Sequence, residues 1–194
     1  SSYTGKVGNV APNRLRRRCY SQIRHQKITT DTREFKWYNM DSTDREVIKN
    51  IYLEPFMSLC NREISSHGVS SSPSAKGIVD ALNTAIEITS DCPYRRTFHS
   101  DQGWGYQMKV YVNTLQENRI FQSMSRKGNC HDNSVMENFF GIMKQEMYYG
   151  EVFYSYDELK EAIDKYIEYY NKQRIKEKLG WMSPVEYRLS LIVA

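Results

Sequence analysis

Three acidic residues stand far apart in the sequence, in surroundings where their carboxylates can share metal ions. Asp31 lies in a run of threonines, Asp101 precedes Gln and Gly, and 35 residues separate Asp101 from Glu137. Carboxylates on separate elements can hold two Mg²⁺ ions, and such a pair promotes in-line displacement at phosphorus. The three residues therefore favour an enzyme that cuts and joins DNA.

The context of each acid carries more weight than the spacing, because Asp and Glu usually lie exposed on the surface. Asp101 comes just after a short apolar strand, Asp31 lies within a threonine-rich strand, and Glu137 lies in the first turns of a helix. Sites in mixed α/β sheets gather at strand ends and at the starts of neighbouring helices. This context favours one shared site over three solvated surface carboxylates.

The alternation of apolar and polar residues predicts an α/β fold with a mixed five-stranded sheet flanked by helices. The strands are expected at 28–35, 51–59, 63–69, 97–99 and 120–124. The polar segment 36–50 is expected to be a connection, and 60–62 a tight hairpin turn. Helices are expected to begin near 71, 108, 133, 155 and 183, the fourth with a capping box from Ser155 to Glu158.

The positive charge is concentrated at the start of the chain. The net charge is +4, but residues 1–30 contain seven Lys and Arg and no Asp or Glu. The remainder has 20 basic and 23 acidic residues, a balance of −3. Such a basic arm suits a polyanion such as DNA through counterion release, and a solvated leader is an equally open interpretation. We expect an arm or linker over 1–26, a core over 27–150 and a C-terminal helical extension over 151–194.

The cysteine and hydropathy patterns favour a protein of a reducing cytoplasm. The four cysteines are scattered without a Cys-x-x-Cys pair, which argues against a disulfide framework or a zinc site. No run of about 20 apolar residues predicts a membrane span, and the start shows no secretory signal. Because residue 1 is Ser rather than Met, we expect the chain to be a fragment or a processed product.

Several motifs together resemble one protein family. They are His-Ser-Asp-Gln-Gly at 99–103, the segment 123–133, Glu-Asn-Phe-Phe-Gly with a following lysine at 137–144, and the segments 52–64, 169–174 and 178–187. Over roughly residues 5–190 the chain resembles the catalytic half of bacterial insertion-sequence transposases. These belong to the DDE group, whose core is similar to that of retroviral integrases.

The resemblance implies an RNase H-like fold in which Asp31, Asp101 and Glu137 are both the catalytic residues and the metal ligands. It implies two Mg²⁺ or Mn²⁺ ions as cofactors, with DNA strand cleavage and strand transfer as the reaction. The implied partners are the element ends, the target DNA and further copies of the same protein. The implied location is the bacterial cytoplasm, with no membrane partner.

Four donors suit contact with DNA phosphates: Arg126, Lys127 and Asn133 in the loop before the catalytic helix, and Lys144 within that helix, where the family pattern supports the role. Lys144 comes seven residues after Glu137, so both lie on one side of that helix, where the lysine can hold a phosphate. An exposed helix lysine and a polar loop whose Asn133 caps the helix are the alternatives that the residues leave open.

Three positions depart from the family pattern, and at the first of them Ile28 stands where the family usually has an aromatic residue. Arg33 stands where the family has threonine, and because strand side chains alternate, it shares a face with Asp31 and can compete with a metal there. Ser58 replaces a family aspartate, which removes a carboxylate near the site or a structural hydrogen bond. We hypothesise a preserved fold with impaired activity. A non-catalytic DNA-binding remnant and an RNase H-like nuclease that only hydrolyses are the alternatives.

Overall fold

The computed structural model describes residues 8, 10–16, 18–41, 43, 45–126 and 133–193, so Lys127 lies outside the described residues. The strands are β1 (Lys27–Thr30), β2 (Arg33–Met40), β3 (Glu46–Ser58), β4 (Ile64–Ser70), β5 (Thr97–Ser100) and β6 (Phe121–Met124). The α-helices are α1 (Ala75–Ile88), α2 (Lys109–Glu117), α3 (Ser134–Met143), α4 (Tyr156–Lys172) and α5 (Pro184–Val193). Shorter helical segments are Trp104–Gln107 and Glu177–Leu179, both 3₁₀, and a π-helix at Lys144–Tyr148.

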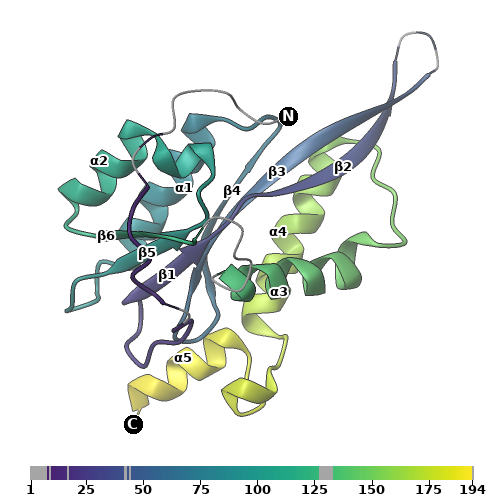
Figure 1. Cartoon of the computed structure of the whole chain (residues 1–194). Coiled ribbons are helices and arrows are strands. Elements are labelled where there is room, and N and C mark those ends of the chain that lie inside the picture. Colours follow the sequence, from purple (N-terminus) through teal and green to yellow (C-terminus); the bar gives the residue numbers. More distant parts are fainter. Residues whose placement is uncertain are drawn as a thin grey trace.

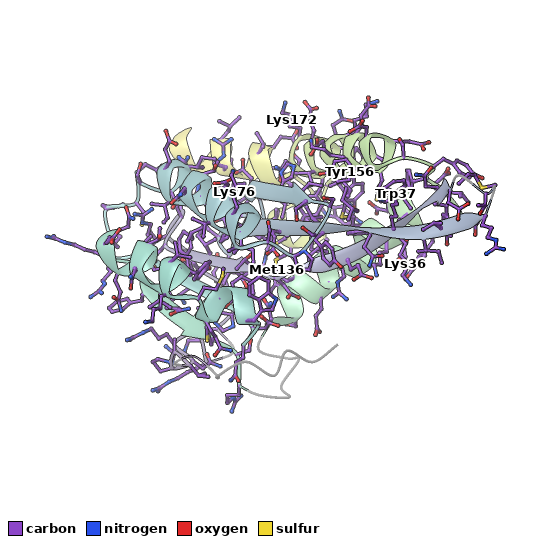
Figure 2. All side chains as sticks on the ribbon, turned by 90° about the horizontal axis from the view of Figure 1, so that it is seen from above. Lys36, Trp37, Lys76, Met136, Tyr156 and Lys172 are labelled. Carbon is purple, nitrogen blue, oxygen red and sulfur yellow. The ribbon has the colours of Figure 1, made fainter. Side chains whose placement is uncertain are left out.

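These strands form one mixed sheet between two layers of helices (Figure 1). α1 and α2 pack on one face of the sheet around Phe56 and Phe98, and α3 and α4 pack on the other face around Phe35 and Leu53. Figure 2 shows the side chains between these layers, where Met136 of α3 is fully buried. Within the described ranges, no helix is both long and apolar enough to cross a membrane.

β1 and β2 are consecutive segments of one interrupted strand. Thr30 of β1 pairs with Phe56 of β3, and Arg33 of β2 pairs with Leu53 of β3. The step from Thr30 to Arg33 is three residues forward, and the step from Phe56 to Leu53 is three residues back. Both segments therefore share one antiparallel register with β3. The strand predicted over 28–35 is present but is interrupted by two residues. Counting β1 and β2 as one interrupted strand, the six strands correspond to the five predicted ones.

The prediction that 36–50 forms a connection is wrong. β2 and β3 extend through this segment as a long hairpin that projects from the rest of the molecule (Figure 1). Phe35 and Trp37 are buried, whereas Glu34 and Lys36 between and beside them are exposed. Lys36 is therefore an outward-facing residue of a period-two strand pattern and not part of a loop.

Three neighbouring strands run parallel and end at the same edge of the sheet. β5 pairs with β1, where His99 lies opposite Thr29, and β6 pairs with β5, where Ser123 lies opposite His99. β3 runs antiparallel to β1 and carries β4 on its other side. Since the carboxyl ends of parallel strands share an edge, residues that follow β1 and β5 are brought together there.

The helix starts follow local capping chemistry. Ser155 Oγ accepts a hydrogen bond from the Glu158 N–H at 3.1 Å, which confirms the predicted cap of α4, and the Glu158 carboxylate accepts in return from the N–H of Tyr154, one residue before the cap, at 2.8 Å. Ser74 Oγ accepts from the Gly77 N–H at 3.2 Å, so α1 begins slightly later than the predicted start near 71. α3 begins at the predicted place and passes into the π-helix after Met143.

Candidate active site

The carboxylates of Asp31 and Asp101 come together at the carboxyl ends of two parallel strands. Thr29 pairs with His99, and each aspartate follows two residues later on its own chain segment. Burial and the neighbouring charge of Asp101 raise the pKa of Asp31 to about 7. Burial also raises the pKa of Asp101. Two half-buried acids that repel each other form a place where a cation is favoured.

Backbone N–H groups orient both carboxylates. The Thr32 N–H donates to Asp31 Oδ1 at 2.9 Å, and the Gly103 N–H donates to Asp101 Oδ1 at 2.8 Å. A Cβ atom at position 103 would lie 2.9 Å from that same Asp101 oxygen. Glycine is therefore required at position 103 because the backbone there lies so close to the Asp101 carboxylate.

Glu137 lies in the first turn of α3, and Asn133 ties the start of this helix to β1. The Thr29 hydroxyl donates to Asn133 Oδ1 at 2.7 Å, and Asn133 Nδ2 donates to the Thr30 carbonyl at 3.3 Å. Asn133 is 7% exposed and stands at the N-cap position, although its side chain accepts no bond from the helix. Its amide is thus bonded within the protein, and its contact with DNA stays a prediction.

The third carboxylate stands apart from the other two. The Glu137 side chain is exposed, and its charge is the smallest of the influences that raise the pKa of Asp31. In the part of the chain that the structure describes, no group of three or more His, Cys, Asp or Glu is gathered closely enough to hold a metal ion. The fold therefore joins two of the three predicted ligands. Their oxygen donors fit a hard cation such as Mg²⁺ or Mn²⁺.

A fourth acid, Glu54 of β3, belongs to this site and was not predicted. It is 5% exposed, and its carboxylate accepts hydrogen bonds from the Thr32 hydroxyl and, at 3.0 Å, from the Tyr106 hydroxyl. Burial raises the pKa of Glu54 to about 7, with added repulsion from Asp31 and Asp101. Its one signal in the sequence is an acid within the otherwise apolar run 51–57.

Two basic side chains flank the site on the α3 face of the sheet. The Arg33 guanidinium lies 4.9 Å from the centre of the Phe140 ring, and its charge lowers the pKa of Asp31 by less than burial raises it. Lys144 Nζ lies 5.6 Å from the centre of the Phe35 ring. Burial and the charge of Arg33 lower the pKa of Lys144. The contact of Lys144 with DNA stays a prediction.

Ser58 lies at the end of the β1–β3 pair that is farther from Asp31. It pairs with Ile28, three residues before Asp31, and its side chain is fully buried. Among the described residues its hydroxyl has no hydrogen-bond partner. The position favours the loss of a structural hydrogen bond over the loss of a site carboxylate.

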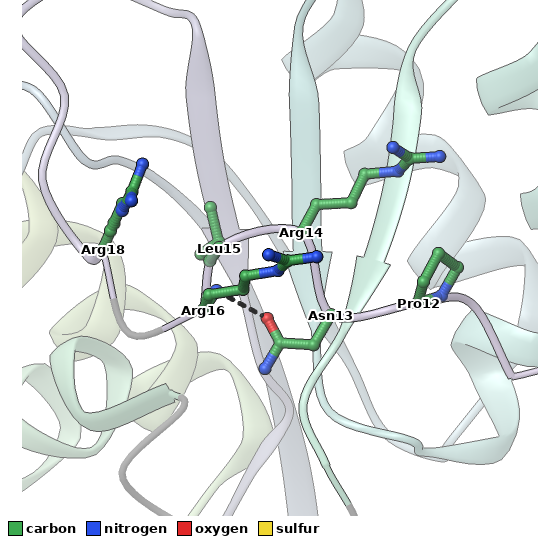
Figure 3. Close-up of a pocket in the computed structure, with 6 residues that line it drawn as sticks. All are labelled: Pro12, Asn13, Arg14, Leu15, Arg16 and Arg18. Carbon is green, nitrogen blue, oxygen red and sulfur yellow. Dashed lines mark hydrogen bonds between the residues drawn. The ribbon is translucent and has the colours of Figure 1, made fainter.

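Basic residues near the start of the chain lie over β6. The Arg14 N–H donates to Ser123 Oγ at 2.9 Å, and the neighbouring Leu15 is 2% exposed. A pocket of about 300 Å³ is lined by Pro12, Asn13, Arg14, Leu15, Arg16 and Arg18 (Figure 3). Ser123 pairs with His99 of β5, so the backbone of this segment crosses β6 beside the strand that leads to Asp101. Arg126, also exposed, follows β6, and its contact with DNA stays a prediction.

Comparison with known proteins gives two matches to the integrase core domain, one over residues 24–130 and one over 137–190. A transposase-like protein of Haemophilus influenzae is 43% identical over 96% of this chain and 82% of its own length. The transposase assigned to insertion sequence element IS150 of Escherichia coli K12 is 42% identical over 96% of this chain. This chain spans 62% of that relative, which is less than two thirds of its length.

Solved structures share the fold at low sequence identity. The catalytic core domain of HTLV-2 integrase, in complex with magnesium, matches with a TM-score of 0.61 and 11% identity over 85% of this chain and 97% of its own. The catalytic domain of the Mos1 mariner transposase matches with a TM-score of 0.55 and 11% identity over 74% of this chain and 70% of its own. These likenesses confirm the RNase H-like fold. Together with the sequence matches, they show that the chain belongs to the integrase-core family of insertion-sequence transposases.

Proposed function

We propose that the chain is the catalytic core of a DDE-type transposase, which cleaves DNA strands at element ends and transfers them to target DNA. The proximity of Asp31 and Asp101, which follow the paired strands β1 and β5, carries this proposal, and Glu137 lies in the first turn of α3. Membership of the integrase-core family supports the same reaction class.

In this proposal Asp31, Asp101 and Glu137 hold two Mg²⁺ or Mn²⁺ ions. When bound, such ions supply activation of the attacking oxygen and stabilisation of the departing one. The chain itself contributes orientation, because backbone N–H groups fix the two aspartates and Asn133 fixes the start of the helix that carries Glu137. Two aspartates that are fixed before the metal arrives lose less freedom on binding it.

In this proposal DNA is held by the hydrogen-bond donors of Arg126, Lys127, Asn133 and Lys144 and by the arginines of the N-terminal arm. Contacts to phosphates position a duplex without reading its sequence. Because two element ends must be joined in one event, we propose a homo-oligomer assembled on DNA in the bacterial cytoplasm.

Calorimetric titration with Mn²⁺, followed by strand cleavage and strand transfer assays, tests the proposal on the purified chain and on Asp101→Asn. The DNA substrate for these assays is a duplex that contains the terminal repeat found next to the gene for this chain. We expect the parent to bind Mn²⁺ and to give cleaved and joined products, and the variant to lose at least about tenfold in Mn²⁺ affinity. Asp80→Asn, which changes an exposed aspartate of α1, is the matched control and should behave as the parent.

The other outcomes distinguish the alternatives. Cleavage without joined products would favour a nuclease that only hydrolyses. An absence of Mn²⁺ binding, both with and without the duplex, would favour a non-catalytic DNA-binding remnant. The impairment hypothesised from Arg33 and Ser58 stays a prediction, and faster cleavage in Arg33→Thr would support it.

A further inference from the structure

Three side chains form a hydrogen-bonded cluster at the interruption between β1 and β2. Thr32 lies in the interruption, Glu54 lies on the facing strand β3, and Tyr106 lies in the 3₁₀ segment after Asp101. Both hydroxyls donate to the Glu54 carboxylate, and the two hydroxyl oxygens lie 3.2 Å apart. The cluster therefore joins three segments that are far apart in the sequence.

Thr32 connects this cluster to the candidate active site. Its backbone N–H donates to Asp31 Oδ1, while its side chain is held by Glu54 on the α1 and α2 face of the sheet. Neighbouring residues of an extended chain point to opposite faces. Holding Thr32 on one face therefore turns Asp31 toward the other face, where Asn133 and the start of α3 lie.

Burial of Glu54 beside two other acids is unfavourable unless hydrogen bonds compensate it. The Thr32 and Tyr106 hydroxyls supply these bonds. Tyr106 is 2% exposed, and its ring packs edge-on against Tyr111 with 5.4 Å between ring centres. The donor is thus held in place by the core, which makes the cluster a rigid support rather than a loose surface contact.

We infer that Glu54 is a positioning residue that, through Thr32, fixes the direction of the Asp31 carboxylate. Glu54 is additional to the three carboxylates assigned to the reaction, and it acts on the site without touching DNA. Its effect on metal binding rests on the proposed function, whereas its effect on the Thr32 backbone does not.

Calorimetry with Mn²⁺ on the parent chain, Glu54→Ala and Glu54→Gln tests this role. Alanine removes both acceptors, whereas glutamine keeps the shape, with a carbonyl oxygen for Thr32 and an amide that donates to Tyr106. We expect Glu54→Ala to weaken Mn²⁺ binding by about 10- to 100-fold, as losses of outer-shell partners do, and Glu54→Gln to remain within a few-fold of the parent. Thr32→Val should reproduce the loss seen in Glu54→Ala.

Glu63→Ala is the control for general damage to the fold. Glu63 follows the other end of β3, where it pairs with Arg188 at 2.7 Å, so its loss should lower stability and leave Mn²⁺ affinity unchanged. Unchanged affinity in Glu54→Ala would overturn the inference. Equal losses in Glu54→Ala and Glu54→Gln would also overturn it, because they would assign the effect to charge rather than to position.

A second readout needs no metal and separates this inference from the proposed function. Hydrogen exchange of the Thr32 amide should accelerate at least about tenfold in Glu54→Ala and stay close to the parent rate in Glu54→Gln. If the parent binds no Mn²⁺, the proposed metal site fails, and this exchange rate still decides whether Glu54 holds Thr32. An unchanged rate in Glu54→Ala would then refute the positioning role.

Discussion

Asp31 and Glu54 each have a pKa raised to about 7 by burial and by neighbouring acids. Near neutral pH the metal-free protein therefore keeps protons on groups that are ionised in an ordinary solvated setting. Metal ligands must give up such protons, so metal affinity and pH are linked at this site. The same acids also link pH to the stability of the fold.

We expect the metal-free chain to lose stability through these groups as pH rises from about 4 to about 7. In the unfolded chain Asp31 ionises near its ordinary pKa of 3.8, whereas the folded chain keeps this proton up to about 7. Between these limits the unfolded state holds fewer protons, so the free energy of unfolding falls with rising pH, and the loss is complete above the folded pKa.

Asp31→Asn removes the contribution of this acid and keeps an oxygen for the Thr32 N–H. At about pH 7.5 in EDTA, its thermal midpoint should lie about 2–4 °C above the parent midpoint. A gain of ~1 kcal/mol in the free energy of unfolding shifts the midpoint of a domain of this size by that much. Near pH 4 the two midpoints should nearly coincide. Circular dichroism across the range measures the difference, and parallel curves at every pH would contradict the raised pKa.

At the scale of elements, two asparagines fasten helices to strands in the same manner. Asn133 bonds to Thr29 and Thr30 and sets the start of α3 against β1. Asn171 of α4 accepts from the Ile64 N–H at 2.9 Å and donates to the Ile64 carbonyl at 3.0 Å, which sets α4 against β4. Only the first of these attachments lies beside the carboxylates.

Asn133→Ala should therefore affect both stability and catalysis. Loss of its hydrogen bonds leaves the buried Thr29 hydroxyl without its acceptor and should cost about 1–3 kcal/mol in free energy of unfolding. The start of α3 is then less fixed, so strand cleavage should fall by about tenfold or more, as in other losses of outer-shell support. Urea unfolding and the cleavage assay measure the two effects.

Asn171→Ala is the matched control, with a similar loss of stability and an unchanged rate of cleavage. Thr29→Val separates positioning from DNA contact, because it removes the protein partner of Asn133 and leaves the amide in place. Equal cleavage defects in Asn133→Ala and Asn171→Ala would show that the effect is general destabilisation.

At the scale of the whole molecule, a net charge of +4 conceals a strongly basic start and a slightly acidic remainder. The start is seated on the fold, because Leu15 is buried and the Arg14 backbone is bonded to Ser123. Over the same strand, the guanidinium groups of Arg14 and Arg95 lie 4.3 and 3.5 Å from the centre of the Phe121 ring. The resulting basic surface lies over β6 and reaches its amino end, where Phe121 pairs with Thr97.

Replacing Arg14, Arg16 and Arg18 together by Gln should weaken binding to duplexes of any sequence. For each phosphate that the variant no longer neutralises, the slope of log K against log salt concentration should become shallower by about 0.9. Fluorescence anisotropy at several salt concentrations measures the slope. Gln at Lys160, Lys165 and Lys172 is the control, because it removes the same charge from α4, where each lysine pairs with an acid. Equal slopes in both triple variants would contradict a DNA-binding role of the arm.

The amino-acid sequence alone was enough to predict the family, the candidate site residues and most of the local structure. Period-two and helical patterns predicted the five strand positions of the sheet and the helices. They could do so because the side chains on one face of a strand or helix recur at a fixed spacing in the sequence. The Ser155 capping box was predictable since cap and helix are adjacent in the chain. Family motifs around Asp101 and Glu137 predicted the fold and the family without any knowledge of contacts, and the reaction class stays a proposal.

The tertiary structure alone decided which of these residues meet. Asp31 lies beside Asp101 because β1 and β5 pair in one particular register, which no local pattern encodes. Glu54 joins them only through the antiparallel pairing of β3, and Arg33 lies over Phe140 only because α3 packs on that face. The physical reason is that burial and hydrogen bonding between distant segments depend on the packing of the whole sheet, whereas helix and strand patterns are local.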